Sequence, residues 1–136
     1  MTKNGNNEWI VAGIGAKKAG KGSVTTHIRS GGVLMTPEQA LKQTFGPKAE
    51  AVLDNAKETA VMLAQQIEKN NKYLLGELGF DLGIDQDEKV WMFEANAKPG
   101  RSIFKHPSLK SQGRESIENL VDYCLYLSKF RVRRDS

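Results

Sequence analysis

Three oxygen-bearing side chains stand near the ends of two β-like runs in residues 79–101, GFDLGIDQDEKVWMFEANAKPGR. Asp81 lies among apolar residues of the first run, and Glu94 and Asn96 end the second, VWMFEAN. Side chains two residues apart in a strand share a face, so Glu94 and Asn96 point the same way, about 7 Å apart. A carboxylate among apolar neighbours is costly without a partner, so we expect something to meet these oxygens.

Pairing the two runs as an antiparallel hairpin brings the acids together. If residues 79–85 pair with residues 90–96 around a turn at residues 86–88, Asp81 falls opposite the Glu94–Asn96 end. Carboxylates and an amide oxygen suit Mg²⁺, which completes its shell with water and phosphate oxygens. The sequence therefore predicts that Asp81, Glu94 and Asn96 are metal ligands. The alternative is solvent-facing charge on an edge hairpin, which is the expectation for the acids of the turn: Asp85, Asp87 and Glu88.

The glycine-rich segment 15–23, GAKKAGKGS, offers a different phosphate site. It fits the first seven positions of a P-loop, but Gly22 stands where the Mg²⁺-binding hydroxyl is required. The next residues, VTTHI, favour a strand rather than the helix that a P-loop opens. We therefore interpret the segment as a hairpin loop, with its lysines facing either water or a phosphate.

The elements that must position these side chains follow from turn, cap and periodicity signals. The Asn4-Gly5 turn predicts a hairpin between residues 1–3 and 9–14, and residues 24–28 predict a further strand. Thr36-Pro37 predicts a short helix that ends near Gly46, and a long helix follows from Pro47 to about Asn71. A last helix is expected to bury the apolar side chains of Ile117, Leu120, Val121, Cys124 and Leu127.

This order of elements predicts an α+β fold, an antiparallel sheet with helices packed on one face. At 136 residues with 39% hydrophobic and 26% charged side chains, the chain is expected to form one globular domain. No apolar run is long enough to span a bilayer, and residues 1–9 lack the apolar core of a signal peptide. With a single cysteine, these features predict a cytoplasmic protein without a membrane partner.

The net charge of +4 gathers near the two ends of the chain. We divide the sequence into a domain at residues 1–128 and a basic tail at residues 129–136, RVRR being its centre. Aromatic residues are scarce beside these basic residues, which disfavours nucleic acid as a partner. His27 and His106 lie far apart without a neighbouring cysteine, which disfavours zinc.

Two stretches, WIVAGIGAKKAGKGSVTTHIRSGG and ELGFDLGIDQDEKVWMFEANAKPGR, together resemble the ATP-grasp superfamily. The resemblance is to its YheC/YheD-type, endospore-coat-associated branch and covers roughly residues 9–127. It implies the C-terminal subdomain of an ATP-grasp ligase, which joins a carboxylate to an amine or thiol through an acyl phosphate. ATP and Mg²⁺ are the implied cofactors, with Asp81, Glu94 and Asn96 at the positions of the metal ligands.

The resemblance also implies roles for basic residues. Lys17 and Arg29 are the nearest matches to the side chains that contact the ATP phosphates, and Arg29 matches the one beside the acyl phosphate. Arg101 and Ser102 follow the metal motif and would face the acceptor carboxylate, because an arginine fork binds a carboxylate through two hydrogen bonds.

In the family an N-terminal subdomain holds the adenine and part of the phosphates. The resemblance therefore implies that this chain is a fragment, inactive alone, with that subdomain as its partner, and exposed apolar surface predicts a homo-oligomer. The alternative is a degenerate ATP-grasp fold that serves as a structural or interaction module of the spore coat, which would place the protein there rather than in the cytoplasm.

Overall fold

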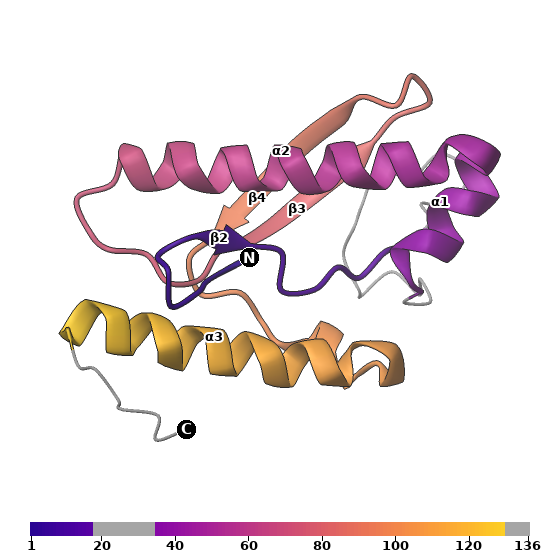
Figure 1. Cartoon of the computed structure of the whole chain (residues 1–136). Helices are drawn as coiled ribbons and strands as arrows, with labels where there is room; N and C mark the ends of the chain where they lie inside the picture. Colours follow the sequence, from indigo (N-terminus) through magenta and orange to yellow (C-terminus); the bar gives the residue numbers. More distant parts are fainter. Residues whose placement is uncertain (18–34, 130–136) are drawn as a thin grey trace.

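The computed structural model describes residues 1–17 and 35–129. Its helices are α1 (Pro37–Phe45), α2 (Ala49–Lys69) and α3 (Lys110–Ser128), with 3₁₀ turns at Gly46–Lys48, Ser102–Lys105 and Pro107–Leu109. Strands β1 (Thr2–Lys3) and β2 (Trp9–Ile10) form one antiparallel pair, and β3 (Gly79–Ile84) and β4 (Val90–Asn96) form another. The fold is shown in Figure 1.

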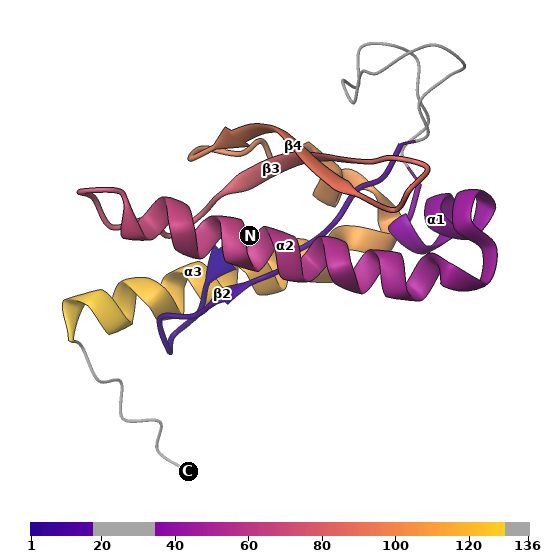
Figure 2. The same ribbon diagram turned by 90° about the horizontal axis from the view of Figure 1, so that it is seen from above.

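The prediction of an α+β fold is confirmed, but the expected single sheet is replaced by two small sheets of two strands each. A bridge between Thr2 and Glu77 links β1 to the approach of β3. The β1–β2 hairpin lies between α2 and α3 (Figure 1), and the β3–β4 hairpin covers another side of α2 (Figure 2). The predicted strand at residues 24–28 and the tail beyond Lys129 lie outside the described residues.

The predicted helix starts follow local capping chemistry. Thr36 Oγ1 accepts a hydrogen bond from the Gln39 N–H at 3.3 Å, and Pro37 occupies the first helical position, as predicted. The helix ends at Gly46, whose φ of +56° is a conformation that glycine adopts without steric cost. Residues 46–48 then form a 3₁₀ turn, so α2 begins two residues later than predicted.

Helix α2 is the element on which both ends of β3 pack. Near its C-terminal half, Phe80 joins the buried cluster of Trp9, Ala64 and Leu78. Near its N-terminal half, Ile84 joins a second cluster formed by Leu41, Val52 and Leu53. One face of β3 is therefore held on α2 by apolar contacts along the strand, which leaves the other face outward.

The predicted buried face of α3 is wrong. Ile117 and Val121 are each 53% exposed, Leu127 is 40% exposed and Cys124 is also exposed. The buried residues of the helix are instead Gly113, Ser116 and Tyr123, and Leu120 of the predicted face is half-buried. Periodicity alone favoured the apolar stripe, but α3 is oriented by polar contacts to Ser116 and by the packing of the larger Tyr123 ring.

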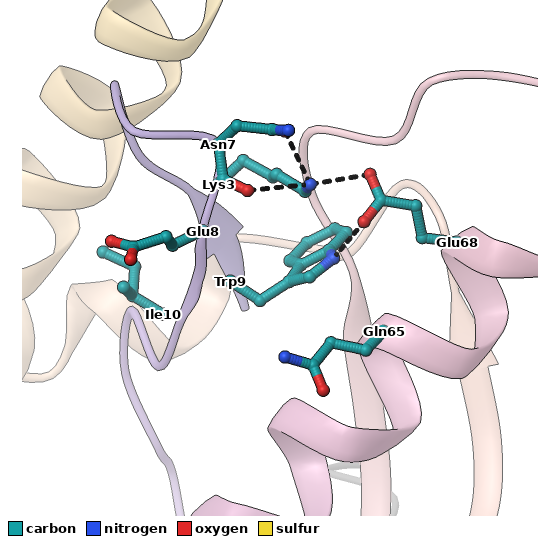
Figure 3. Close-up of a pocket in the computed structure, with 7 residues that line it drawn as sticks. All are labelled: Lys3, Asn7, Glu8, Trp9, Ile10, Gln65 and Glu68. Atoms are coloured by element: carbon teal, nitrogen blue, oxygen red, sulfur yellow. Dashed lines mark hydrogen bonds and ion pairs between the residues drawn. The ribbon is translucent and has the colours of Figure 1, made fainter.

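A buried ion pair joins the β1–β2 hairpin to α2. Lys3 Nζ lies 2.7 Å from Glu68 Oε1, and the Lys3 side chain is only 3% exposed. The other carboxylate oxygen accepts a hydrogen bond from Trp9 Nε1 at 2.9 Å, and Asn7 Oδ1 accepts one from Lys3 Nζ at 2.7 Å (Figure 3). The ammonium also lies 5.4 Å from the Trp9 ring centre, so this buried charge is well compensated.

We predict that Glu68→Ala destabilises the fold by about 3 kcal/mol, because it leaves a buried ammonium without its counter-ion. Lys3→Met should cost less, since it removes the buried charge and leaves Glu68, which is 26% exposed, free to reach water. Urea denaturation measures both changes, with Glu58→Ala on the exposed side of α2 as control. Equal losses for Glu68→Ala and Glu58→Ala would contradict a stabilising role for the pair.

The turn of the β3–β4 hairpin is organised by one carboxylate. Asp85 Oδ1 accepts hydrogen bonds from the N–H groups of Asp87 and Lys89, each at 2.9 Å. Its Oδ2 accepts a hydrogen bond from Trp91 Nε1 at 2.8 Å. These bonds favour the ionised form, so the Trp91 hydrogen bond, followed by the Lys89 N–H bond, lowers the pKa of Asp85 from its usual value.

The lowered pKa of Asp85 predicts a loss of hairpin stability in acid. A carboxyl group whose pKa is lower in the folded state stabilises the fold above its unfolded pKa, about 3.9, and less as pH falls through its folded pKa. As the pH falls below the unfolded pKa, Asp85→Asn should therefore lose less stability than the wild type. Urea midpoints against pH measure this, with Asp87→Asn as control. Parallel curves for wild type and Asp85→Asn would contradict the assignment.

Candidate functional site

The predicted pairing of the two runs is confirmed residue by residue at the acidic end. Gly79 pairs with Asn96, and Asp81 pairs directly with Glu94. Cross-strand partners share a face of the sheet, and so do residues two apart along a strand. Asp81, Glu94 and Asn96 therefore project from the same face of the hairpin, as the sequence predicted.

A β-bulge decides which face this is. The register shifts between Asp81, which pairs with Glu94, and Leu82, which pairs with Met92, so Phe93 is the extra residue. Val90 pairs with Ile84 on the face toward α2. Simple alternation from Val90 would place Glu94 on that inner face as well, whereas the bulge places it outside with Asp81.

The outer face also carries exposed aromatic side chains. The Phe93 ring lies over Gly83, where an added Cβ would come within 2.5 Å of the ring, and Phe93 is 54% exposed. Trp91 pairs with Gly83 and is 49% exposed. Both aromatic rings of β4 are therefore about half exposed.

The three predicted ligands are solvent-exposed rather than buried among apolar neighbours. Within residues 1–17 and 35–129, the carboxylates of Asp81 and Glu94 form no hydrogen bond or ion pair. Like charges placed directly opposite each other on neighbouring strands repel. The described protein therefore supplies no partner for these two carboxylates and leaves their repulsion uncompensated.

The acids at the other end of the hairpin are different. Asp85 accepts three hydrogen bonds within the turn, and Glu88 Oε1 lies 2.5 Å from Lys48 Nζ. The described part of the chain brings no three His, Cys, Asp or Glu side chains together in a metal-binding group. A cation site on this hairpin must therefore rest on the carboxylates of Asp81 and Glu94 with an amide, not on a dense acidic cluster.

Such a donor set fits Mg²⁺, which binds proteins through one or two carboxylates and takes its remaining ligands from water and phosphate. Asn96 Oδ1 accepts a hydrogen bond from the Lys98 N–H at 2.8 Å, which fixes the orientation of the amide and leaves a second lone pair on the oxygen. The hairpin base is closed by Pro99, which lies against Gly79, where an added Cβ would meet it at 2.6 Å.

Four further site residues were predicted: Arg101, Ser102, Lys17 and Arg29. The first three are among the described residues, and Arg29 is not. The Arg101 guanidinium donates to Glu77 Oε1 at 2.7 Å, to the Gly113 carbonyl at 3.1 Å and to Ser116 Oγ. Ser102 is exposed at the start of a 3₁₀ turn. Lys17 is the last described residue before the gap, and Arg29 lies within it.

Sequence reasoning missed Glu77, Ser116 and the Phe93 bulge. Glu77 and Ser116 are single polar residues whose importance comes only from meeting Arg101 in the folded chain. No local signal marks them. The bulge had one signal in the sequence. In a regular strand Val90, Met92 and Glu94 would share one face, so a charged side chain would lie on the same face as two apolar ones.

Comparison with known proteins identifies a family and a relative of this chain. A model of the YheC/D-like ATP-grasp family matches residues 1–127. The endospore coat-associated protein YheD of Bacillus subtilis (strain 168) is 39% identical over 129 residues, which cover 93% of this chain and 28% of that protein. This chain therefore spans about a quarter of the relative's length.

No solved structure matches the chain. Among the described helices, none is both long and apolar enough to cross a membrane. The family match covers nearly all of the sequence, including both strands that carry Asp81, Glu94 and Asn96. The chain belongs to the YheC/D-like ATP-grasp family.

Proposed function

We propose that this chain is the C-terminal subdomain, residues 1–128, of an ATP-grasp ligase and that its β3–β4 hairpin binds the Mg²⁺–phosphate part of ATP. The observation that carries the proposal is the directly opposed pair Asp81 and Glu94, exposed and without a partner in the described residues, beside the oriented amide of Asn96. A divalent cation would turn this repulsion into coordination.

The proposed chemistry is ligation of a carboxylate to an amine or thiol through an acyl phosphate. Bound Mg²⁺ would neutralise phosphate charge, which is the main requirement of phosphoryl transfer. Asp81, Glu94 and Asn96 would hold the cation, Lys17 and Arg29 would contact phosphate oxygens, and Arg29 would also stabilise charge on the transferred group. Ser102 is proposed near the acceptor carboxylate, the position that the sequence also predicted for Arg101.

The outer face of the hairpin is also the proposed contact with an N-terminal ATP-grasp subdomain. Two aromatic side chains on this face, Trp91 and Phe93, remain about half exposed beside the proposed metal ligands. A second subdomain that covered them would bury apolar surface and exclude water from the phosphates. Without it, the apolar surface favours self-association of the chain.

A second candidate is a structural or interaction module of the spore coat built on a degenerate ATP-grasp fold. Two observations favour it: the relative is named as endospore coat-associated, and α3 exposes a stripe formed by Ile117, Val121 and Leu127. A module of this kind would need the stripe and not the acidic pair. The proposed location is the cytoplasm for the ligase and the spore coat for the structural module.

Replacement of the acidic pair separates the two candidates. Glu94→Gln should weaken Mn²⁺ binding, used as the probe for Mg²⁺, by about tenfold or more while stabilising the metal-free fold by about 0.5 kcal/mol, because it removes a like-charge pair. Mn²⁺ titration and urea denaturation measure the two effects. Asp87→Asn, which removes a charge from the turn, should change Mn²⁺ binding little.

The outcome against a metal site is equal Mn²⁺ affinity in wild type and Glu94→Gln. A large loss of stability in metal-free Glu94→Gln would instead make the residue structural. Asp81→Asn should repeat the result of Glu94→Gln, since the two carboxylates face each other across the strands.

We further expect this chain alone to bind Mg²⁺–ADP weakly, because half of a cleft leaves most of the ligand in water. It should show no ligase activity and should form dimers or larger species. Calorimetry and light scattering measure both properties. Tight nucleotide binding by a monomer would contradict the proposal that a second subdomain completes the site.

A further inference from the structure

Arg101 is the most highly connected cation described near the β3–β4 hairpin. Its guanidinium donates to a carboxylate, Glu77, to a backbone carbonyl, Gly113, and to a hydroxyl, Ser116. It also lies 5.1 Å from the ring centre of Phe104. Three of the five N–H donors of the guanidinium, including both on Nη2, are therefore engaged by the protein itself.

The groups that bind Arg101 are themselves fixed. Ser116 is 1% exposed, and its hydroxyl donates to the Gly113 carbonyl at 2.8 Å, the same oxygen that Arg101 binds. Gly113 packs so closely on Phe104 that an added Cβ would come within 2.8 Å of it. Arg101 is therefore anchored to the first turns of α3 through a compact, partly buried group of contacts.

The other end of the connection is the base of the hairpin. Glu77 bridges to Thr2 of β1 and lies two residues before Gly79, the partner of Asn96. The return loop leaves Asn96, passes Pro99, which lies against Gly79, and reaches Arg101. Glu77 precedes β3 and Arg101 follows β4. Their ion pair thus connects the start of one strand of the acidic site to the segment that leaves the other.

We propose that Arg101 is a positioning residue for the acidic site. It ties the exit of β4 to Glu77 and α3, and so fixes Asn96 and Glu94 relative to Asp81, instead of offering its guanidinium to an acceptor carboxylate. This inference rests on the proposed metal site, and it replaces the substrate contact that the sequence alone suggested for this residue.

The two roles predict opposite signs for cation binding. By Coulomb's law, removal of a positive charge from the protein can only strengthen the hold of its carboxylates on a cation. Loss of a group that orients metal ligands weakens binding, commonly by tenfold to a hundredfold. A substrate-binding arginine would produce only the electrostatic effect on a bare metal ion, so the direction of change decides between the roles.

The test is titration of the whole chain with Mn²⁺, in which electron paramagnetic resonance measures the concentration of free Mn²⁺. Arg101→Met should weaken Mn²⁺ binding about tenfold, and Glu77→Gln should weaken it in the same direction. Arg101→Lys should recover part of the affinity, because an ammonium can pair with Glu77 but cannot make all three contacts. Arg114→Met is the matched control, since Arg114 is 87% exposed on α3 and pairs with Glu118 alone among the described residues.

Backbone amide exchange supplies a second readout that needs no metal. Arg101→Met should speed exchange at Ala95 and Asn96 and leave the Ile84–Val90 end of the hairpin unchanged. If the wild type binds no Mn²⁺, the metal proposal fails, and amide exchange still decides whether Arg101 positions the strand. Unchanged exchange at Asn96, or tighter Mn²⁺ binding in Arg101→Met, would overturn the inference. If Arg101→Met does not fold, amide exchange at Ala95 and Asn96 in Glu77→Gln decides it, because the lost negative charge of Glu77 by itself weakens cation binding.

Discussion

The antiparallel register of β3 and β4 determines every other feature of the proposed site. A shift of one residue would move the acids to the face that packs on α2, because side chains alternate between faces. The register is held from the inner side, where Phe80 and Ile84 insert into two separate apolar clusters on α2. Apolar packing on one face thus fixes the position of charge on the other.

The bulge at Phe93 reconciles two demands that a regular strand cannot meet together. Val90 and Met92 pair with inward-facing Ile84 and Leu82, while Glu94 pairs with outward-facing Asp81. One extra residue between them changes the phase of the alternation and adds an aromatic ring to the outer face. Bulges are frequent beside functional sites for this reason, since they redirect side chains without breaking the sheet.

The contrast between the two ends of the hairpin is energetic as well as geometric. At the turn, Asp85 accepts three hydrogen bonds and Glu88 pairs with Lys48, so the protein satisfies its own charges. At the base, Asp81 and Glu94 face each other without compensation from the described residues. The repulsion between these two carboxylates lowers the stability of the fold. A pair of residues that lowers stability is typical of a binding site.

The sequence predicted the elements whose signals are local. The Thr36-Pro37 cap, the long helix α2 and the pairing of Asp81 with Glu94 all follow from capping, periodicity and turn position, and all are confirmed. The buried face of α3 was wrong because its orientation depends on Tyr123 and Ser116, whose partners are distant in sequence.

The same limit applies to the site. Residue type and spacing predicted that Asp81, Glu94 and Asn96 share one face of the hairpin, because a strand has a fixed period and a hairpin a fixed geometry. That they bind a cation remains a proposal. The contacts of Arg101 with Glu77 and α3 could not be predicted, since they arise only where three separate segments meet. Its position after the motif suggested a ligand contact, and only the folded chain reveals how far its donors are already engaged.

The central claim is that a divalent cation binds at the base of the hairpin and not at its turn, which carries more acidic residues. The most direct test is paramagnetic broadening of backbone amide signals by substoichiometric Mn²⁺. The two acidic groups lie about 13 Å apart along β3, four residues at strand spacing, so the broadening resolves them. The account predicts selective broadening around Asp81, Glu94 and Asn96. Broadening centred on Asp85 and Asp87, with sharp signals at Glu94, would contradict it.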